Sequence, residues 1–512
     1  MANSTTVDLG WYPPSQTLIN NLTNVVSNGT TGVYGFIYNS SYTPDDEYGT
    51  YNWCNMPHVR AKEYVRPSEE YELVYVELIH RHHKRTPYAA NSFPVESYTW
   101  DCNDEGLYYF ARPFSSPSGS SPSSSPHPDA GRNSSALTYW ETFSGLNPFE
   151  ALASGWKGTC QFPQITSQGL DDSWQHGADL YAVYHDLLGF LPDRDEEDWR
   201  DKVRYRVTNN VITSEVAGMV INGMWNTTTT SVPLLIQPDG VDSLEPDYTC
   251  TSSSTQFSTI QSAGGNPAWA AHLEAAAGVF AALDSISGVA SDDSGFHASF
   301  DHYYDNLSAR QCHGKPLPCK LVNGTGGGGA GLVNDTQECV TQGLADEVYR
   351  FGNWEYSQVY RDSGAESLAA SVGSFGVWVA ELAAHLRGVI GGGGGGGDGT
   401  IWFHNVAHDG SVSRLLGVLQ VDVMVWPGMG SEVVFEVWKG PGSGGGGSNT
   451  TTTAGAAAAA VDSGKKGSRE TREKDTSASG YYIRVLFGGR VLTSSNPSLG
   501  TLDLVPVEIL LA

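Results

Sequence analysis

Three short segments of the chain have the pattern of strands that are buried in a sheet. Residues 73–80 form a mostly apolar run, which is typical of a strand covered on both faces. In residues 203–207 apolar side chains alternate with arginines, so this strand has one apolar and one polar face. Residues 401–405 predict a third strand. The Gly488-Gly489 pair between two apolar segments predicts a β-hairpin near the C-terminus.

Apolar residues recur at helical spacing between these strands. One such pattern covers residues 170–188, a second covers residues 375–389 with Gly391 following as a C-terminal cap, and a third covers residues 412–419. Strands that alternate with helices predict an α/β fold: a central mixed, mostly parallel sheet flanked by helices.

The α/β pattern covers residues 70–505 and is interrupted by inserts. Residues 90–165 and 226–365 contain cysteines and fit a sheet poorly, so we expect them to form a smaller, mainly helical cap subdomain. Residues 1–69 are expected to be an N-terminal extension that is partly wrapped on the core. Four low-complexity stretches cannot bury a core and are expected to be disordered loops, at residues 113–130, 324–332, 391–399 and 441–479.

The charge balance limits the possible partners. The chain has 512 residues, of which 39% are hydrophobic, and 29 basic residues face 56 acidic ones for a net charge of −27. A surface this negative repels nucleic acid and anionic lipid, so neither is expected as a partner. The sequence has no run of eighteen apolar residues, and we expect no membrane span. An anionic substrate would need a local cluster of arginines and histidines to bind. Nothing in the sequence indicates an oligomeric state.

Cysteines and glycosylation motifs favour an oxidising, secretory compartment. The seven cysteines include no CxxC pair, which argues against zinc ribbons and thioredoxin chemistry. The chain has ten Asn-X-Ser/Thr motifs where chance would give roughly four. We therefore expect most cysteines to pair, with Cys312 and Cys319 as the best local pair and one thiol left over. Residues 1–27 show no export signal, and we expect that signal to be missing from this chain.

A cluster of basic residues follows the first buried strand directly. Residues 81–87 read Arg-His-His-Lys-Arg-Thr-Pro, so Arg81 and Arg85 flank His82 at the carboxyl end of the strand. Open α/β sheets hold their ligands at this edge. Guanidinium groups match the oxygens of a phosphate, and a neutral imidazole held among them can attack phosphorus. The alternative interpretation is a solvated basic turn.

His408 and Asp409 occupy the equivalent place in a distant segment. They follow the strand at residues 401–405 and precede a helix that we expect to begin near Ser411. Helix N-terminal N–H groups favour anions, so this pair could also face a phosphate. The alternative is that Asp409 only caps the helix.

Arg206 is a further candidate for binding phosphate. It lies toward the end of the strand at residues 203–207, on the polar face, before a helix expected from about Ile212. Arg204 shares this face but sits deeper in the strand, so we expect it to be a surface or structural charge.

These motifs resemble those of a known family. Residues 81–87 resemble the RHGxRxP signature of the histidine acid phosphatases, which include the phytases, and residues 407–409 resemble the family's second signature, around His-Asp. Residues 205–208 are similar to the segment that supplies the family's third phosphate-binding arginine, and residues 164–169 are similar to its turn into a helix. The resemblance extends over residues 70–505 and is greatest for fungal-type secreted acid phosphatases.

The resemblance implies a phosphomonoesterase that uses neither a metal nor another cofactor and acts on a small phosphorylated substrate. His82 would be the nucleophile that forms a phosphohistidine, and Asp409 would protonate the leaving alcohol. The groups that would hold the phosphoryl oxygens are Arg81, Arg85, Arg206 and His408. Four cations would offset the charge of the transition state without a metal ion.

One position departs from the family pattern and keeps two alternatives open. His83 stands where the family usually has glycine, and a histidine there could narrow the pocket or require an ordinary backbone conformation. The protein could therefore be a secreted glycoprotein that keeps the fold without catalysis. A metallohydrolase is the other alternative, with a site built from His80, His82, His83, His404 and His408, although the neighbouring arginines would repel a cation.

Overall fold

The computed structural model describes residues 10–27, 51–94, 98–102, 158–196, 198–227, 231–323, 332–393, 399–441 and 479–512. The loops that we expected to be disordered fall almost entirely outside these ranges, at residues 113–130, 324–332, 391–399 and 441–479. Much of the expected cap insert at residues 90–165 also lies outside them.

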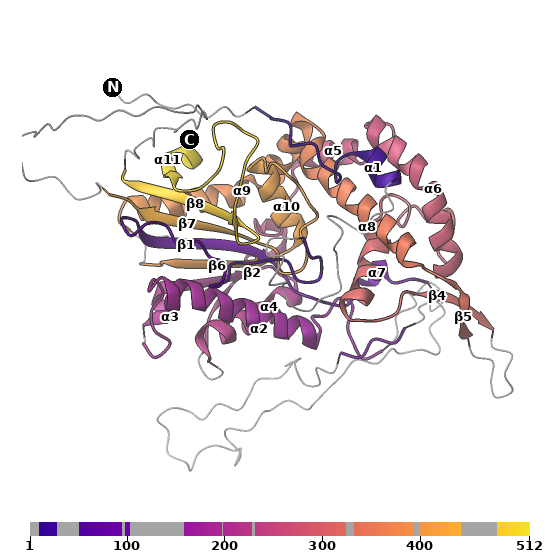
Figure 1. Cartoon of the computed structure of the whole chain (residues 1–512), viewed down its shortest axis with the longest axis horizontal. Helices are drawn as coiled ribbons and strands as arrows, with labels where there is room; N and C mark the ends of the chain where they lie inside the picture. Colours follow the sequence, from indigo (N-terminus) through magenta and orange to yellow (C-terminus); the bar gives the residue numbers. More distant parts are fainter. Residues whose placement is uncertain are drawn as a thin grey trace, which may run out of the picture.

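A mixed sheet forms the centre of the α/β part, in the order β10-β8-β7-β1-β6-β2-β3, with β9 paired to β8 (Figure 1). β1, β6, β2 and β3 pair in parallel, and β7, β8, β9 and β10 add antiparallel pairs at the other side. The predicted α/β fold and hairpin are therefore confirmed. The strands are β1 (Glu72–Arg81), β2 (Val203–Val207), β3 (Leu234–Leu235), β6 (Trp402–Ala407), β7 (Glu432–Lys439), β8 (Tyr481–Phe487), β9 (Arg490–Val491) and β10 (Val505–Pro506).

The register of the central strands brings the two sequence motifs to one edge. β1 is buried from Tyr75 onward because both of its faces are covered by helices. It runs parallel to β6, with Arg81 opposite Ala407, and β6 runs parallel to β2, with Asn405 opposite Arg206. The carboxyl ends of three parallel strands therefore meet at one edge of the sheet.

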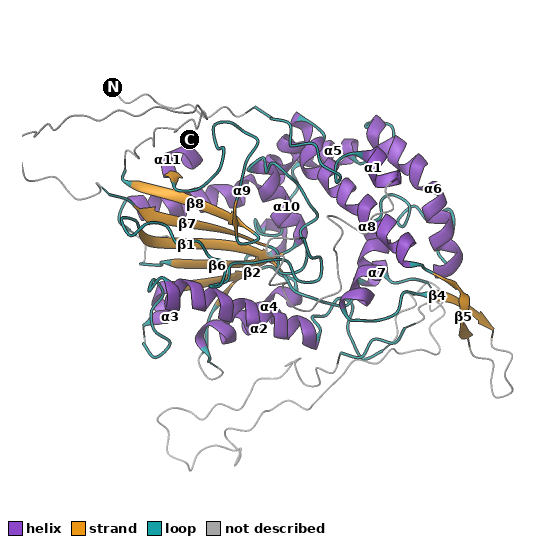
Figure 2. Cartoon of the chain, viewed as in Figure 1, coloured by secondary structure: helices purple, strands orange, loops and turns teal. Residues whose placement is uncertain are grey.

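Helices cover both faces of this sheet (Figure 2). One face packs against α2 (Ser167–Tyr181), its π-helical continuation (Ala182–Leu187), α3 (Trp199–Lys202) and α4 (Val211–Trp225). The other face packs against α9 (Ala365–Ile390), α10 (Asp409–Val418) and α11 (Val507–Leu511). All three predicted helical patterns are thus confirmed as helices. α10, however, begins at Asp409 rather than near Ser411, because His408 already has the extended backbone of an N-cap residue.

A second, mainly helical body lies beside the sheet and has its own apolar core (Figure 1). Its core contains Trp269, Phe280, Phe300 and Trp354. Residues 51–56 also pack into this core, so part of the N-terminal extension belongs to the helical body. Its elements are α1 (Leu22–Ser27), α5 (Thr251–Ile260), α6 (Pro267–Ser287), α7 (Asp301–Cys312), β4 (Cys319–Asn323), β5 (Leu332–Cys339), α8 (Gln342–Ser357) and a π-helical turn (Gln358–Asp362). The domain boundaries given above stay a prediction.

The protein has three disulfides, of which one joins segments 258 residues apart and one closes a hairpin. They are Cys54–Cys312, Cys102–Cys160 and Cys319–Cys339, and Cys250 is a free cysteine. The expected Cys312–Cys319 pair is therefore wrong. Cys312 ends α7 and faces the N-terminal segment, whereas Cys319 begins β4 directly opposite Cys339 in the β4–β5 hairpin.

α9 is the one helix in the described ranges that is long and apolar enough to cross a membrane, with a mean hydropathy of 1.4 in its most apolar window. One face of α9 supplies Phe375, Trp378, Leu382 and Leu386 to the core that covers the sheet. A core helix of this kind meets the same criteria of length and composition.

Candidate active site

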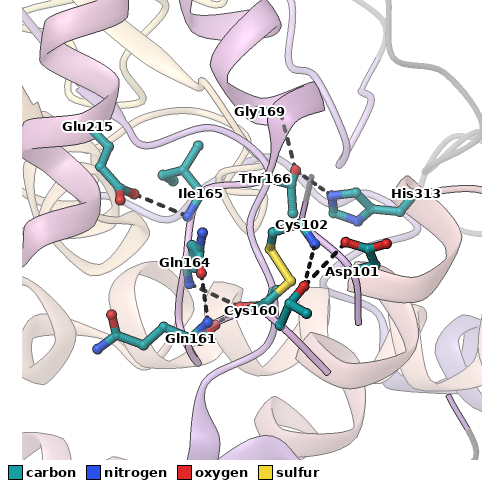
Figure 3. The surroundings of a disulfide bond; sticks show 12 residues. Asp101, Cys102, Cys160, Gln161, Gln164, Ile165, Thr166, Gly169, Glu215 and His313 are labelled. Atoms are coloured by element: carbon teal, nitrogen blue, oxygen red, sulfur yellow. Dashed lines mark hydrogen bonds between the residues drawn. A yellow bond between two sulfur atoms is a disulfide. The ribbon is translucent and has the colours of Figure 1, made fainter. Parts of the chain in front are cut away.

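The loop at residues 81–87 is held at the edge of the sheet by the segment that leads into α2. The Thr166 N–H donates to the Lys84 carbonyl at 3.2 Å. A β-carbon on Gly169 would lie 2.0 Å from the same carbonyl oxygen, so only glycine permits this approach. Thr166 caps α2 by accepting from the Gly169 N–H and also contacts His313 (Figure 3). The predicted turn into a helix at residues 164–169 is thereby confirmed.

Other contacts fix this segment from both sides. The Ile165 N–H donates to a carboxylate oxygen of Glu215 on α4 at 3.2 Å, and the Cys102–Cys160 disulfide lies alongside (Figure 3). The loop that carries His82 is therefore packed against residues 164–169, which are themselves held in place, and is not surrounded by solvent.

His82 is buried at the base of the loop with a defined orientation. Its Nδ1 lies 2.9 Å from the His83 carbonyl oxygen. A carbonyl can only accept, so Nδ1 carries the hydrogen and Nε2 keeps its lone pair. Burial, followed by the charges of Arg81, Arg85 and His408, holds the pKa of His82 well below its ordinary value. The lowered pKa favours the neutral ring, which is the form that a nucleophile requires.

Arg81 is buried and aimed by three contacts. Its Nη1 donates to the Pro427 carbonyl at 2.7 Å, and its guanidinium lies over the Trp53 ring, 4.5 Å from the centroid. Its Nη2 lies 3.4 Å from the Asp409 carboxylate. These contacts hold the guanidinium in one position beside Asp409.

Arg85 is held by the helical body. Its Nη1 donates to the Asp305 carboxylate of α7 at 2.9 Å, and its guanidinium lies 4.2 Å from the centroid of the Tyr88 ring. Burial would lower the pKa of Arg85, but Asp305 raises it, so the group stays charged. α7 thus orients one of the cations at the end of β1.

His408 faces His82, with ring centroids 5.4 Å apart. Its Nε2 lies 2.9 Å from the Thr208 hydroxyl and 3.1 Å from a carboxylate oxygen of Glu245. Burial would raise the pKa of Glu245, but the hydrogen bond to His408 holds it below its ordinary value. A carboxylate therefore occupies the side of His408 that faces the end of β2.

Asp409 is the first residue of α10 and lies beside both arginines. Its Oδ2 accepts from the Trp426 indole N–H at 2.7 Å and from the Tyr356 hydroxyl at 3.1 Å. Burial would raise the pKa of this carboxyl, but Arg81, the Trp426 hydrogen bond and Arg85 together hold it below its ordinary value. Without substrate, Asp409 is therefore ionised.

Arg206 is not joined to these five residues. Its guanidinium donates to Glu381 at 2.7 Å and lies 3.1 Å from Asp242. Further hydrogen bonds go to Gln237 and Ser243. Arg206 would have to exchange these partners to bind a phosphate, and its role as a phosphate ligand stays a prediction.

A cavity of about 550 Å³ opens beside His408 and Asp409. Besides Asp409, its wall carries three carboxylates, Asp239, Glu245 and Asp247, and the guanidinium of Arg414. None of these wall residues stands in a recognisable motif. The same holds for three groups that orient the site from outside the cavity wall, namely Asp305, Tyr356 and Trp426.

His83 does not narrow this cavity. Its side chain is fully buried, and its Nε2 lies 3.0 Å from Nδ1 of His176 on α2. The backbone of His83 has no positive φ, so the loop needs no glycine at this position. The glycine stands opposite, at Gly430, where a β-carbon would lie 2.4 Å from the His83 ring. The His83 ring fits here because Gly430 has no side chain.

The histidines considered for a metal site fall into two groups. His82 and His408 face each other, whereas His80 and His83 contact His176. His404 lies next to His80, with ring centroids 4.9 Å apart. The five histidines named above therefore do not form one set of ligands.

No protein-family model and no curated protein sequence matches the chain. Among solved structures, the Klebsiella sp. ASR1 phytase is similar at 14% identity over 84% of each chain, with a TM-score of 0.45. The D. castellii phytase is similar at 11% identity over 90% of this chain and 83% of its own, with a TM-score of 0.40. The Bifidobacterium longum multiple inositol polyphosphate phosphatase, in complex with phosphate, is similar at 10% identity over 86% of this chain and 92% of its own, with a TM-score of 0.41. At these values the likeness does not argue for a shared activity.

Proposed function

We propose that the protein is a phosphomonoester hydrolase of the acid phosphatase type that acts through a phosphohistidine on His82. The observation that carries the proposal is the orientation of His82. Its Nε2 is left with a bare lone pair, the charges of Arg81, Arg85 and His408 act on its ring, and Asp409 pairs with Arg81. A neutral nucleophile among cations fits an anionic electrophile such as a phosphate ester.

The reaction has two balanced steps. In the first, His82 Nε2 forms a bond to phosphorus while the ester P–O bond breaks, and Asp409 gives its proton to the departing alkoxide. In the second, water attacks the phosphohistidine, Asp409 takes a proton from that water, and phosphate leaves with the N–P bond broken. Arg81, Arg85 and His408 offset the charge on the phosphoryl oxygens in both steps, so the chemistry requires no metal ion.

The negative charge of the cavity wall affects which substrates can bind. Asp239, Glu245 and Asp247 would repel a leaving group that carries further phosphates. The geometry therefore favours a small ester with one phosphate and a neutral or cationic leaving group.

Disulfides support a secretory location for this enzyme. Three pairs of cysteines are bonded, which is typical of proteins in an oxidising compartment. One of the glycosylation motifs is not usable in the folded protein, because the Asn306 amide is buried and donates to the Asn91 carbonyl. Asn21 and Asn334 are exposed and remain candidates for glycosylation.

The test is hydrolysis of p-nitrophenyl phosphate at acidic pH with EDTA present. We expect full turnover in EDTA, because the proposed mechanism needs no exchangeable metal. Turnover that disappears in EDTA and returns with a divalent cation would favour a metallohydrolase. A folded protein that cleaves no phosphomonoester under any condition would favour the non-catalytic alternative.

A further inference from the structure

Three histidines form a buried cluster beneath the loop that carries His82. His80 is the next-to-last residue of β1, His83 lies in the loop and His176 lies on α2, and none of the three has any exposed surface. One ring nitrogen of each lies within 4.8 Å of one ring nitrogen of each of the others. None of the three lines the cavity beside His408, and none is among the residues proposed to attack or bind the phosphate, although the His83 carbonyl accepts from His82 Nδ1.

Two of these rings have a fixed tautomer. The Nδ1 of His80 lies 2.8 Å from the Arg81 carbonyl oxygen, and the Nε2 of His176 lies 3.0 Å from a carboxylate oxygen of Glu432. A carbonyl oxygen only accepts, and so does the Glu432 oxygen while that carboxyl is ionised, although burial raises the pKa of Glu432. With Glu432 ionised, both of these nitrogens carry hydrogen. The other nitrogen of each ring, Nε2 of His80 and Nδ1 of His176, is therefore a bare lone pair in a buried place.

The described residues do not satisfy both lone pairs. His83 Nε2 can donate to His176 Nδ1 at 3.0 Å, but His80 Nε2 then has no hydrogen-bond partner among the described residues. His83 Nδ1 is also buried without a partner in that part of the chain. Unpaired buried polar atoms are costly, so such atoms call for a ligand.

The surroundings match those of a metal-binding histidine. A metal-bound imidazole usually donates its second N–H to a carbonyl or carboxylate oxygen, which fixes the ring and its tautomer. His80 does this to the Arg81 carbonyl and His176 does it to Glu432. Glu432 is itself fully buried, so its negative charge would offset part of the charge of a cation. The arginines of the loop are turned elsewhere, Arg81 to Asp409 and Arg85 to Asp305.

We propose that His80, His83 and His176 together bind one divalent transition-metal ion, with zinc as the expected metal. Three neutral imidazoles are a ligand set that suits zinc, which takes a fourth ligand to complete a tetrahedron. The ion ties the end of β1 and the His82 loop to α2. None of its three ligands is proposed to touch the phosphate, so we assign the ion a structural role. We expect this buried ion to stay in place when EDTA is present in the assay buffer.

The first experiment measures the metal on the intact protein. The chain is produced in a secretory host without a histidine tag, dialysed against EDTA and analysed for metals by mass spectrometry. We expect about one zinc ion per chain, and X-ray absorption at the zinc edge should show three imidazole nitrogens. Less than a tenth of an ion, with no uptake of added Zn²⁺ or Co²⁺, would overturn the proposal and indicate a buried water instead. A ligand set dominated by sulfur or carboxylate would also overturn it.

The second experiment assigns the ligands. His83→Gln, His83→Gly and His176→Gln should each lower the zinc content at least tenfold. His272→Gln is the matched control, because His272 is equally buried and hydrogen-bonded to a glutamate, Glu355, in the helical body. It should keep its zinc. An equal zinc content in all four variants would contradict the proposal. The readout needs no turnover, so it is independent of whether the protein hydrolyses phosphate esters.

Discussion

The Arg81 guanidinium lies 3.4 Å from the carboxylate of Asp409, the residue proposed to protonate the leaving group. This ion pair keeps Asp409 ionised in the free enzyme, although a general acid must be protonated when the ester bond breaks. A bound phosphate dianion would place negative charge beside Arg81 and Asp409. It would therefore offset the effect of Arg81 and raise the pKa of Asp409. The acid is therefore expected to become competent only when substrate is in place.

The Tyr356 hydroxyl offers a way to shift the pKa of this acid. It donates to Asp409 Oδ2 at 3.1 Å and so stabilises the ionised form. Tyr356→Phe should raise the pKa of Asp409 and move the basic limb of the kcat profile upward by about one pH unit for an alkyl phosphate. Tyr360→Phe, a neighbouring ring 5.3 Å away, is the control and should leave the profile unchanged. If both variants had the same pH profile of kcat, proton transfer from Asp409 would not be part of the step that limits kcat.

His82→Ala should abolish turnover. In the proposed mechanism no other side chain forms the bond to phosphorus, so kcat should fall by at least about 1,000-fold. The melting temperature and the three disulfides should be checked to show that the variant is folded. Acid quenching of wild-type protein with ³²P-labelled substrate should not trap the label, since phosphohistidine is acid-labile, whereas alkaline quenching should. A folded variant with more than a trace of activity would rule out His82 as the nucleophile.

The two motifs at the end of β1 and β6 could be predicted because each depends on a local pattern. A buried apolar strand followed at once by Arg81 and His82, or by His408 and Asp409, places polar groups at a strand's carboxyl end. Two parallel strands bring those ends together without any further information. The sequence therefore predicted which of these side chains would meet.

The rest of the site depends on contacts between distant segments. Asp305 of α7 holds Arg85 across 220 residues, and Tyr356 of α8 reaches Asp409 from the helical body. Neither residue stands in a pattern that marks its role, since its partner is set by how the helical body packs on the sheet. The disulfide pairing failed for the same reason, because proximity along the chain favoured Cys312–Cys319.

His83 shows how a departure from a motif can be misread. The residue suggested a narrower pocket, but its side chain turns toward His176 and packs on Gly430. The compensating glycine is more than 300 residues away in the sequence, so the motif alone could not reveal it.

The acidic wall of the cavity should determine which phosphate esters are cleaved. We expect kcat/KM for phosphoethanolamine to exceed that for inositol hexakisphosphate by roughly tenfold or more, because Asp239 and Asp247 repel the extra phosphates. Added salt should reduce this ratio by screening the repulsion. The double variant Asp239→Asn and Asp247→Asn should reduce it too, whereas Asp186→Asn, an exposed acid outside the cavity wall, should not. A preference for the polyphosphate in the wild type would contradict the prediction.

Asp409→Asn should affect substrates according to their leaving groups. An alkyl alkoxide is strongly basic and needs a proton as it departs, while a nitrophenolate leaves almost without help. The variant should therefore lose about 100-fold to 10,000-fold in kcat with an alkyl phosphate and far less with p-nitrophenyl phosphate. The measurement is kcat for both substrates on the wild type and on the one variant.

The position of Asp409 makes the other outcomes informative. α10 begins at Asp409 itself, with His408 as the N-cap residue, and Asp409 Oδ1 accepts from the Gly410 N–H at 2.9 Å. A helix role would in any case predict little change with either substrate, because asparagine serves about as well as aspartate near a helix N-terminus. Equal loss on both substrates would mean that Asp409 acts by holding Arg81 in place across their 3.4 Å contact. Since asparagine keeps the shape but not the charge or the proton, only a loss that grows with the basicity of the leaving group identifies Asp409 as the acid.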